Sequence, residues 1–470
     1  MVRRNRSRAP NTSGALPIPQ LRESVRGRVI APGDAGYDVA RTPFYGGIDR
    51  RPAAIVRVAD EQDVARVVAL ARETGLGLAV RSGGHSALGH SVSEGGLVVD
   101  LGDMRGLEID VPGRTAWAQT GLTAGEYTSA TGDHGLATGF GDTGSVGIGG
   151  LTLGGGIGFL VRKHGLTIDS LLAADVVTAD GRLLRVDAEQ HPDLYWAVRG
   201  GGGNFGVATR FLFRLYEVGT VVGGMLVLPA TPEVVAGFIA AADAAPEELT
   251  TIANVMVAPP MPFLPAEFAG RLTMMALMVY AGPLEAGERA VAPFRSLATP
   301  LADLIRPMGY AEIYEPEDDS YHPTAVGRTL FVDAIDHHTA ETILAHLESS
   351  NAPMRVAQLR VLGGAMARVP VEATAFAHRH ARILVNLAAF WERPEERAER
   401  EAWIADFAAA LPLAEGAYVS FVSQEGEAPV RAAYPGATWE RLREIKARYD
   451  PTNLFHLNYN IPPAAEIARA

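Results

Sequence analysis

The sequence contains no cysteine among its 470 residues, and it contains only two lysines. Without cysteine the chain forms no disulfide, no thiolate metal site, no cysteine nucleophile and no thioether bond to a cofactor. Neither Lys163 nor Lys446 follows a glycine, so the Gly-Lys-Ser/Thr core of a phosphate-binding P-loop is absent. The chemistry of this protein must therefore depend on other side chains.

Long apolar runs and an excess of positive charge are absent as well. No segment reaches the roughly 20 apolar residues of a membrane span, and the Arg-rich stretch Met1–Gly14 lacks the apolar region of a secretory signal. A formal net charge of −12 argues against a nucleic-acid partner, because phosphate binding needs a basic face. We expect a cytoplasmic protein with a disordered tail over Met1–Gly14 and neither a membrane nor a nucleic-acid partner.

Glycine, in contrast, is abundant, with 51 residues, and it is concentrated in three clusters. They are Arg81-Ser-Gly-Gly-His85-Ser, the run from Gly147 to Gly158, and a group that includes Gly201, Gly203 and Gly206. The last has the spacing of a Rossmann fingerprint, but a strand pattern follows it where that fold requires a helix. Side-chain-free loops allow backbone N–H groups to approach a dinucleotide, so the clusters together favour a flavin fold of another type.

Hydrophobic periodicity divides the chain into two regions of mixed helix and strand. In the first region we predict strands over 52–58, 76–80, 97–101, 107–111, 115–119, 172–178, 182–186 and 207–218, and helices over 60–75, 123–134 and 193–199. In the second we predict strands over 223–228, 272–280, 382–390 and 418–422, and helices over 232–244, 284–297 and 394–410. A last helix over 439–447 is expected to return to the first region. Asp180-Gly181 is a hairpin turn signal.

Six motifs, in order over about residues 40–465, together resemble a known family. They are Arg81-Ser-Gly-Gly-His85-Ser, Gly147-Ile-Gly-Gly-Leu-Thr-Leu-Gly-Gly-Gly-Ile-Gly158, Val177-Thr-Ala-Asp-Gly181, Asp193-Leu-Tyr-Trp-Ala-Val-Arg-Gly200, Gly203-Asn-Phe-Gly206 and Tyr449-Asp-Pro-Thr-Asn-Leu-Phe455. The chain resembles the para-cresol methylhydroxylase (PCMH)/vanillyl-alcohol oxidase flavoprotein superfamily, and within it the berberine bridge enzyme-like, 6-hydroxy-D-nicotine oxidase-like branch.

The resemblance implies an α+β fold of two domains. Residues 1–44 would form a tail and lead-in, 45–219 a PCMH-type FAD-binding domain, 220–428 a substrate-binding domain with an antiparallel sheet covered by helices, and 429–470 a segment that returns to the FAD domain.

The resemblance also implies FAD as the cofactor, joined covalently through its 8α carbon to His85. Many relatives add a cysteinyl bond from a position near Thr143, which this chain cannot make, so we expect a single covalent link. The residues expected to bind FAD are Arg81, Ser82, Gly83, Gly84, His85, Ser86, His90, Ser91, Gly144, Gly147, Gly149, Gly150, Gly154, Gly155, Gly156, Asn204 and Asn458.

The catalytic base is left open between two tyrosines. Relatives often carry Tyr-x-Asn-Tyr in a strand before the C-terminal helix, and this chain has Tyr418-Val-Ser-Phe421 there. Tyr418 is therefore one candidate, and Tyr459 near the C-terminus is the other. A phenol with a pKa near 10 needs a neighbouring cation or hydrogen-bond donor to act as a base.

Two histidine pairs invite a metal-site interpretation, which the spacing does not favour. His337-His338 and His378-Arg-His380 have no carboxylate or thiol at ligand spacing, and adjacent or i, i+2 histidines do not share a helix face. We therefore predict no metal site.

The resemblance implies an oxidase in which hydride passes from an alcohol or amine carbon of a small, secondary-metabolite-like substrate to FAD, with O2 as the acceptor. Two alternatives remain. The chain could be a dehydrogenase that uses another electron acceptor, or a flavin-binding protein without turnover, which the altered Tyr418–Phe421 motif keeps open.

Overall fold

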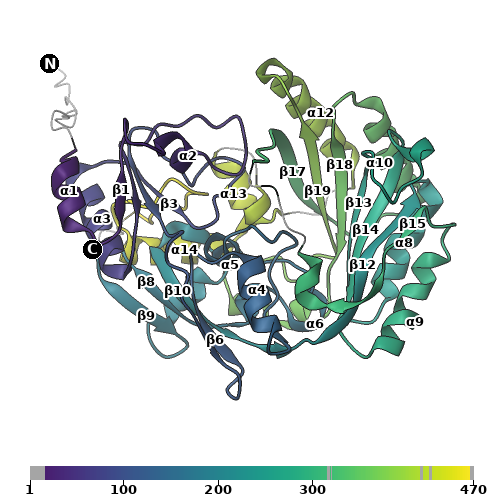
Figure 1. Ribbon diagram of the computed structural model, residues 1–470, viewed down its shortest axis with the longest axis horizontal. Coiled ribbons are helices and arrows are strands. Elements are labelled where there is room, and N and C mark those ends of the chain that lie inside the picture. Colours follow the sequence, from purple (N-terminus) through teal and green to yellow (C-terminus); the bar gives the residue numbers. More distant parts are fainter. Residues whose placement is uncertain (1–15, 315–317, 319, 413–415, 423–425, 466–470) are drawn as a thin grey trace.

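The computed structural model describes residues 16–314, 318, 320–412, 416–422 and 426–465. Figure 1 shows two lobes: the purple-to-blue first part of the chain and its yellow C-terminal end form one, and the teal-to-green middle part forms the other. The chain passes between them from β11 (Tyr216–Glu217) to β12 (Thr220–Pro229). The fold class is the expected α+β one, and the tail predicted to be disordered lies outside the described residues.

The first lobe opens with a four-stranded sheet in the order β1-β2-β4-β3. Its strands are β1 (Arg28–Ile30), β2 (Ala54–Arg57), β3 (Leu78–Arg81) and β4 (Leu97–Asp100). Helix α3 (Glu61–Thr74) begins where the Asp60 side chain accepts the N–H of Asp63, and it ends at Gly75 in the left-handed conformation. Both capping residues lie at the ends of the helix predicted over 60–75. The structure adds β1, α1 (Ile18–Ser24) and α2 (Tyr37–Arg41) in the segment expected to be a lead-in.

A second sheet completes this lobe, in the order β5-β6-β10-β8-β9. Its strands are β5 (Leu107–Asp110), β6 (Thr115–Gln119), β8 (Leu171–Val177), β9 (Leu183–Asp187) and β10 (Val207–Arg214), and short β7 (Leu136–Ala137) pairs with β11. Helix α4 (Ala124–Gly132) starts with a capping box of Thr123 and Glu126. Helices α7 (Pro192–Val198), α13 (Glu427–Ala433) and α14 (Ala437–Tyr449) contribute buried side chains to the same core.

The second lobe is one large antiparallel sheet with helices on its outer face (Figure 1). Its strands run β15-β12-β14-β13-β18-β19-β17, and β16 (Arg306–Gly309) also pairs with β12. The remaining bounds are β13 (Leu249–Val257), β14 (Leu272–Tyr280), β15 (Ala302–Asp303), β17 (Ala325–Val332), β18 (Arg355–Val361), β19 (Ile383–Phe390), α8 (Pro232–Ala244), α9 (Leu284–Arg295), α10 (His337–Ser349) and α12 (Arg397–Ala410). Alternate residues of β19 bury against these helices, and the others, among them Asn386, face the first lobe.

Two local predictions were wrong. The glycine run after Gly147 is not a loop throughout, because Ile148–Gly154 form helix α5, followed by short α6 (Val161–His164). Glycine has a low helix propensity, so the sequence pattern did not indicate helix α5. The segment 418–422 is not a strand: Val419–Phe421 form a 3-10 turn. Strands β13, β17 and β18, helix α10 and short α11 (Ala365–Arg368) were not predicted.

Candidate active site

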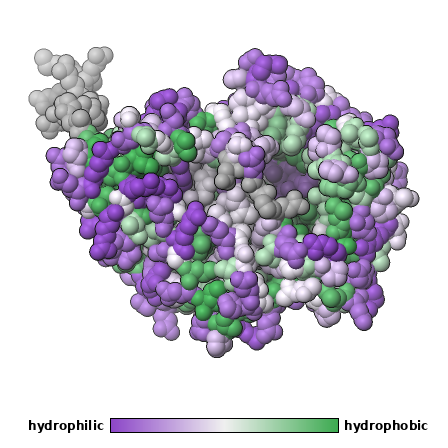
Figure 2. Space-filling model, viewed as in Figure 1, coloured by the Kyte–Doolittle hydropathy of each residue, from purple (hydrophilic) through white to green (hydrophobic). Residues whose placement is uncertain are grey.

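A cavity of about 550 Å³ lies where the glycine-rich segments of the first lobe face the large sheet of the second. Figure 2 shows the surface hollowed between the two lobes. Strands β17 and β19 supply one wall, including Ala325, Gly327, Asn386 and Phe390. Of the residues predicted to bind FAD or act in catalysis, these line the cavity: Ser82, Gly83, Gly84, His85, Ser86, His90, Ser91, Gly147, Gly149, Gly150, Gly154, Tyr418, Asn458 and Tyr459.

The first two glycine clusters meet backbone to backbone at Gly83 and Gly147. A Cβ on Gly83 would lie 2.2 Å from the Gly147 nitrogen, and a Cβ on Gly147 would lie 2.1 Å from the Gly83 nitrogen. The Ser82 hydroxyl ties the two segments further, since it donates to the Thr120 carbonyl and accepts the N–H of Gly149. Only glycine allows this approach, which joins two distant segments into one wall with no side chain at their point of contact.

The imidazole of His85 lies in this wall. Its Nε2 is 3.0 Å from the Ser145 hydroxyl, and its ring stacks on Phe44 with centroids 4.0 Å apart and an interplanar angle of 20°. His90, on the same loop, packs edge-on against Tyr459 at 4.9 Å. Burial, aided by the charge of Arg50, lowers the pKa of His90 to about 4, so this second imidazole is neutral near pH 7.

Arg81, one of the residues predicted to bind FAD, does not lie in the cavity lining. Its guanidinium donates to the backbone carbonyls of Ala40, Arg41 and Ser91, which fixes the loop from behind. Other predicted residues outside the lining are Gly144, Gly155, Gly156 and Asn204. Gly144 accepts a bond from the N–H of Gly125, and thus holds the adjacent loop against α4.

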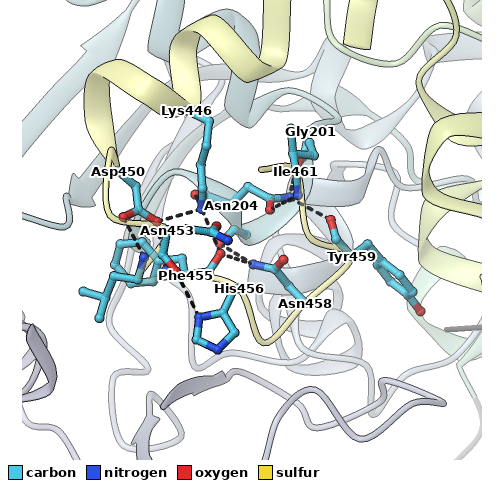
Figure 3. A network of polar contacts seen from close by, with 12 residues as sticks. Gly201, Asn204, Lys446, Asp450, Asn453, Phe455, His456, Asn458, Tyr459 and Ile461 are labelled. Carbon is cyan, nitrogen blue, oxygen red and sulfur yellow. Dashed lines mark hydrogen bonds and ion pairs between the residues drawn. The ribbon is translucent and has the colours of Figure 1, made fainter. Parts of the chain in front are cut away.

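Asn204 instead belongs to a buried network that fastens the C-terminal segment to the first lobe (Figure 3). Lys446 Nζ donates to the carbonyls of Asn204 and Phe455, at 2.8 and 2.9 Å, and to the Asp450 carboxylate at 2.7 Å. The Asn204 amide donates to the Tyr459 carbonyl and accepts the N–H of Ile461. This network places residues 455–461, with Asn458 and Tyr459, against the cavity.

The two candidate bases have different surroundings. The N–H of Gly156 donates to the Tyr418 hydroxyl at 3.0 Å. Burial raises the pKa of Tyr418, and bonds from Ser420 and Gly156 with the charge of Arg360 offset part of that rise. The Tyr459 hydroxyl donates to the Val422 carbonyl, and burial raises its pKa as well. Tyr418 therefore has hydrogen-bond donors at its oxygen and the charge of Arg360 acting on it, although burial leaves its pKa above the usual 10.

An ion pair at the edge of the cavity was not predicted. Arg360 of β18 donates to Asp142 at 2.6 Å, to the Gln358 side chain and to the Ile157 carbonyl at 3.2 Å. Its guanidinium lies 5.0 Å above the Phe421 ring, and its side chain is 3% exposed. Among the described lining residues, Asp142 is the one Asp, Glu, Lys or Arg. The sequence feature that could have pointed to Asp142 is its place in the loop just before the second glycine cluster.

The two histidine pairs contact different groups. Both histidines of the first pair lie 3.6 Å from the Glu341 carboxylate, a carboxylate at helical spacing that the sequence prediction overlooked. His337 Nε2 lies 3.0 Å from the Glu233 carboxylate at the surface, and His378 Nε2 lies 3.0 Å from the Ala432 carbonyl. Within the described part of the chain, no group of three His, Cys, Asp or Glu side chains is placed to hold a metal ion. Nor is any helix of that part long and apolar enough to cross a membrane.

These residues fit FAD. The contact between Gly83 and Gly147 leaves no room for a Cβ on either residue. Ser91 Oγ and Asn458 Oδ1, which belong to lining residues, are buried without a hydrogen-bond partner among the described residues. Together with the mixed-sheet lobe and the facing antiparallel sheet, these features define a flavin-dependent oxidoreductase.

Comparisons with known proteins place the chain in a family. Residues 52–187 match the FAD binding domain family, and residues 417–462 match the family described as berberine and berberine like. The chain is 31% identical to (R)-6-hydroxynicotine oxidase of Paenarthrobacter nicotinovorans, over 94% of this chain and 97% of the relative. The chain therefore belongs to the berberine bridge enzyme-like FAD-linked oxidoreductases.

Other relatives agree with this assignment. An uncharacterized FAD-linked oxidoreductase of Bacillus subtilis, YgaK, is 30% identical over 93% of this chain and 97% of its own. The crystal structure of 6-hydroxy-D-nicotine oxidase from Arthrobacter nicotinovorans superimposes with a TM-score of 0.85 and 28% identity, covering 94% of this chain and 99% of that one.

Proposed function

We propose that this protein is an oxidase that transfers hydride from an alcohol or amine carbon of a small organic molecule to FAD linked covalently through His85, with O2 as the final acceptor. The observation that carries the proposal is the place of His85, a lining residue in a wall built by glycines. Its neighbour on the loop, His90, has its pKa lowered to about 4 and is neutral near pH 7. FAD, when bound, supplies the two-electron acceptor for the substrate and the donor to O2.

Residues of the chain itself would bind the cofactor, exclude water and contact the substrate. Ser82 to Ser91 and Gly147 to Gly154 would hold the cofactor, chiefly through backbone N–H groups, since Arg81 is engaged elsewhere. Aromatic side chains, among them Tyr45 and Phe390, limit the access of water to the substrate side. Asn386 offers an uncharged amide to a polar group of the substrate.

Tyr418 would accept the proton from the O–H or N–H of the substrate. Its hydroxyl is held by the N–H of Gly156, and Arg360 stabilises the phenolate form. We favour it over Tyr459, whose hydroxyl is committed to the Val422 carbonyl. A small-molecule substrate of the secondary-metabolite kind agrees with the wall that β17 and β19 present to the cavity, where Asn386 is the one polar side chain among the described lining residues.

Acid precipitation of the purified protein tests the covalent link. We expect the yellow colour to remain in the pellet for the parent protein, and to appear in the supernatant for His85→Ala. Flavin released by the parent protein would exclude the link.

Anaerobic mixing with a panel of cyclic secondary alcohols and amines tests the oxidase activity. Substrate-dependent bleaching, followed by rapid recovery of colour on admitting air, is expected. Recovery over many minutes would favour a dehydrogenase, and no bleaching with any compound would favour a binding protein.

A further inference from the structure

Two side chains from different segments hold the imidazole of His85. Ser145 precedes α5, and its hydroxyl is 3.0 Å from His85 Nε2. Phe44 follows α2, and its ring stacks on the imidazole at 4.0 Å with an angle of 20°. A hydrogen bond in the ring plane and a stacked ring above it restrict both rotation and tilt of the imidazole.

Both holders are fixed to the backbone around them. The N–H of Phe44 donates to the Gly84 carbonyl at 3.2 Å, and the Phe44 carbonyl accepts from His322 Nδ1 at 3.1 Å. On the other side, the N–H groups of Gly125 and Ala124 at the start of α4 donate to the carbonyls of Gly144 and Val146, each at 2.9 Å. Ser145 therefore sits between two residues anchored to the same helix, and its hydroxyl reaches the imidazole from a rigid loop.

We propose that Ser145 is the positioning residue for the covalent attachment of FAD to His85. This inference rests on the proposed covalent link. Attachment forms a bond between an imidazole nitrogen and the 8α carbon of FAD, and it breaks one C–H bond of that methyl group and the imidazole N–H. The two electrons are taken by the flavin and passed to O2, and O2 takes up the equivalent of the two released protons to become hydrogen peroxide.

A histidine performs this attack only as the neutral tautomer with its lone pair on the reacting nitrogen. The bond between Nε2 and the Ser145 hydroxyl, which can donate or accept, engages this ring nitrogen in either tautomer. It also aims the ring, and a well-oriented group in an intramolecular step gains a large rate advantage. Ser145 does not need to touch the flavin to have this effect.

The test compares Ser145→Ala and Ser145→Thr with the parent protein. Each is purified, incubated with FAD in air, and sampled over time for covalent flavin by intact mass spectrometry and for total flavin by absorbance. We expect Ser145→Ala to bind FAD but to form the link about 10- to 100-fold more slowly. Ser145→Thr keeps the hydroxyl and should form the link at the parent rate.

Each other outcome overturns the proposal. Linkage in Ser145→Ala at the parent rate would show that the hydroxyl is dispensable, and a slow Ser145→Thr would show that the hydroxyl is not what matters. Complete loss of flavin from Ser145→Ala would assign Ser145 to the cofactor cradle itself. A parent protein without covalent flavin would instead contradict the proposed function, and acid precipitation separates the two failures.

Discussion

Arg360 and Asp142 form an ion pair of 2.6 Å that joins the large sheet of the second lobe to the loop before α5 in the first lobe. Their side chains are 3% and 20% exposed, so solvent screens the pair little. The same guanidinium lies over the ring of Phe421, and this ring packs against that of Tyr418 with centroids 5.1 Å apart. One arginine thus connects the interface between the lobes to the candidate base.

Removal of either partner should weaken this interface. We expect Arg360→Met to lower the free energy of unfolding by about 3 kcal/mol, because it leaves Asp142 partly buried without its cation. The double variant Arg360→Met/Asp142→Leu should lose clearly less than the sum of the two single variants. Urea unfolding of the four proteins measures this coupling, and additive losses would show that the pair does not act as a unit.

Gly83 should not tolerate even one methyl group. In Gly83→Ala the new Cβ would lie 2.2 Å from the Gly147 nitrogen, so the two loops must separate. We expect a loss of stability of about 1–3 kcal/mol and a marked drop in bound flavin per protein, read from the absorbance spectrum. Gly219→Ala is the control, because no atom lies within 4 Å of its Cβ position. Equal flavin content in both variants would contradict the tight contact.

Lys446 should be essential for the C-terminal segment to stay in place. Its ammonium group is fully buried and donates to Asp450 and to two carbonyls. Lys446→Met leaves Asp450 uncompensated, which should cost about 3–5 kcal/mol in urea unfolding. Arg448→Met on the same helix is the control: Arg448 is 64% exposed in its pair with Asp193, and such surface pairs contribute roughly 0–1 kcal/mol. Similar losses of unfolding free energy in both variants would show that the buried network contributes no more to stability than a surface ion pair.

The sequence predicted best those features that depend on local signals. Asp60 and Gly75 mark the ends of α3, and the residues of α8 follow helical spacing between Pro232 and Ala244, so both helices were placed within a residue or so. His85 and most of the glycines predicted to bind FAD also line the cavity.

What the sequence did not indicate depends on tertiary contact. Asn254 and Gln358 interrupt the apolar pattern of β13 and β18, because in the fold they bond to each other across the strands at 2.9 Å on the sheet face opposite the helices. Arg81 is adjacent to the glycine loop, yet its guanidinium turns to the carbonyls of Ala40 and Arg41. The partnership of Asp142 with Arg360 spans 218 positions, so no local pattern reveals it.

Acid should destabilise the protein through His164. Burial, with the charge of Lys163, lowers the pKa of His164 in the folded protein from 6.5 to about 4. As the pH falls through 6.5 the unfolded chain takes up a proton that the folded protein does not, so stability present at neutral pH is lost between about 6.5 and 4. Between pH 7 and pH 5, the lowered pKa of His164 reduces the free energy of unfolding by about 2 kcal/mol.

His164→Gln tests this account. Its stability should fall by about 2 kcal/mol less than that of the parent protein between pH 7 and 5, as measured by urea unfolding at each pH. His338→Gln is the control, because that side chain is 88% exposed in its contact with Glu341. An unchanged pH dependence in His164→Gln would mean that other groups account for the acid sensitivity.

Tyr418 and Tyr459 can be separated by their pH profiles once a substrate has been identified from the panel. Because burial raises the pKa of Tyr418 above its usual 10, the phenolate fraction, and with it the rate of flavin reduction, should still rise with pH beyond pH 10. Tyr418→Phe should lower that rate by about 10²–10⁴-fold and abolish its rise with pH.

Two further variants make the assignment specific. Tyr459→Phe loses the bond to Val422 but should keep the pH profile of the parent protein. Arg360→Gln removes the cation that favours the phenolate, so the rise in rate should move to higher pH, a change that a merely structural role of Arg360 would not produce. A profile altered by Tyr459→Phe and left intact by Tyr418→Phe would transfer the role of base to Tyr459.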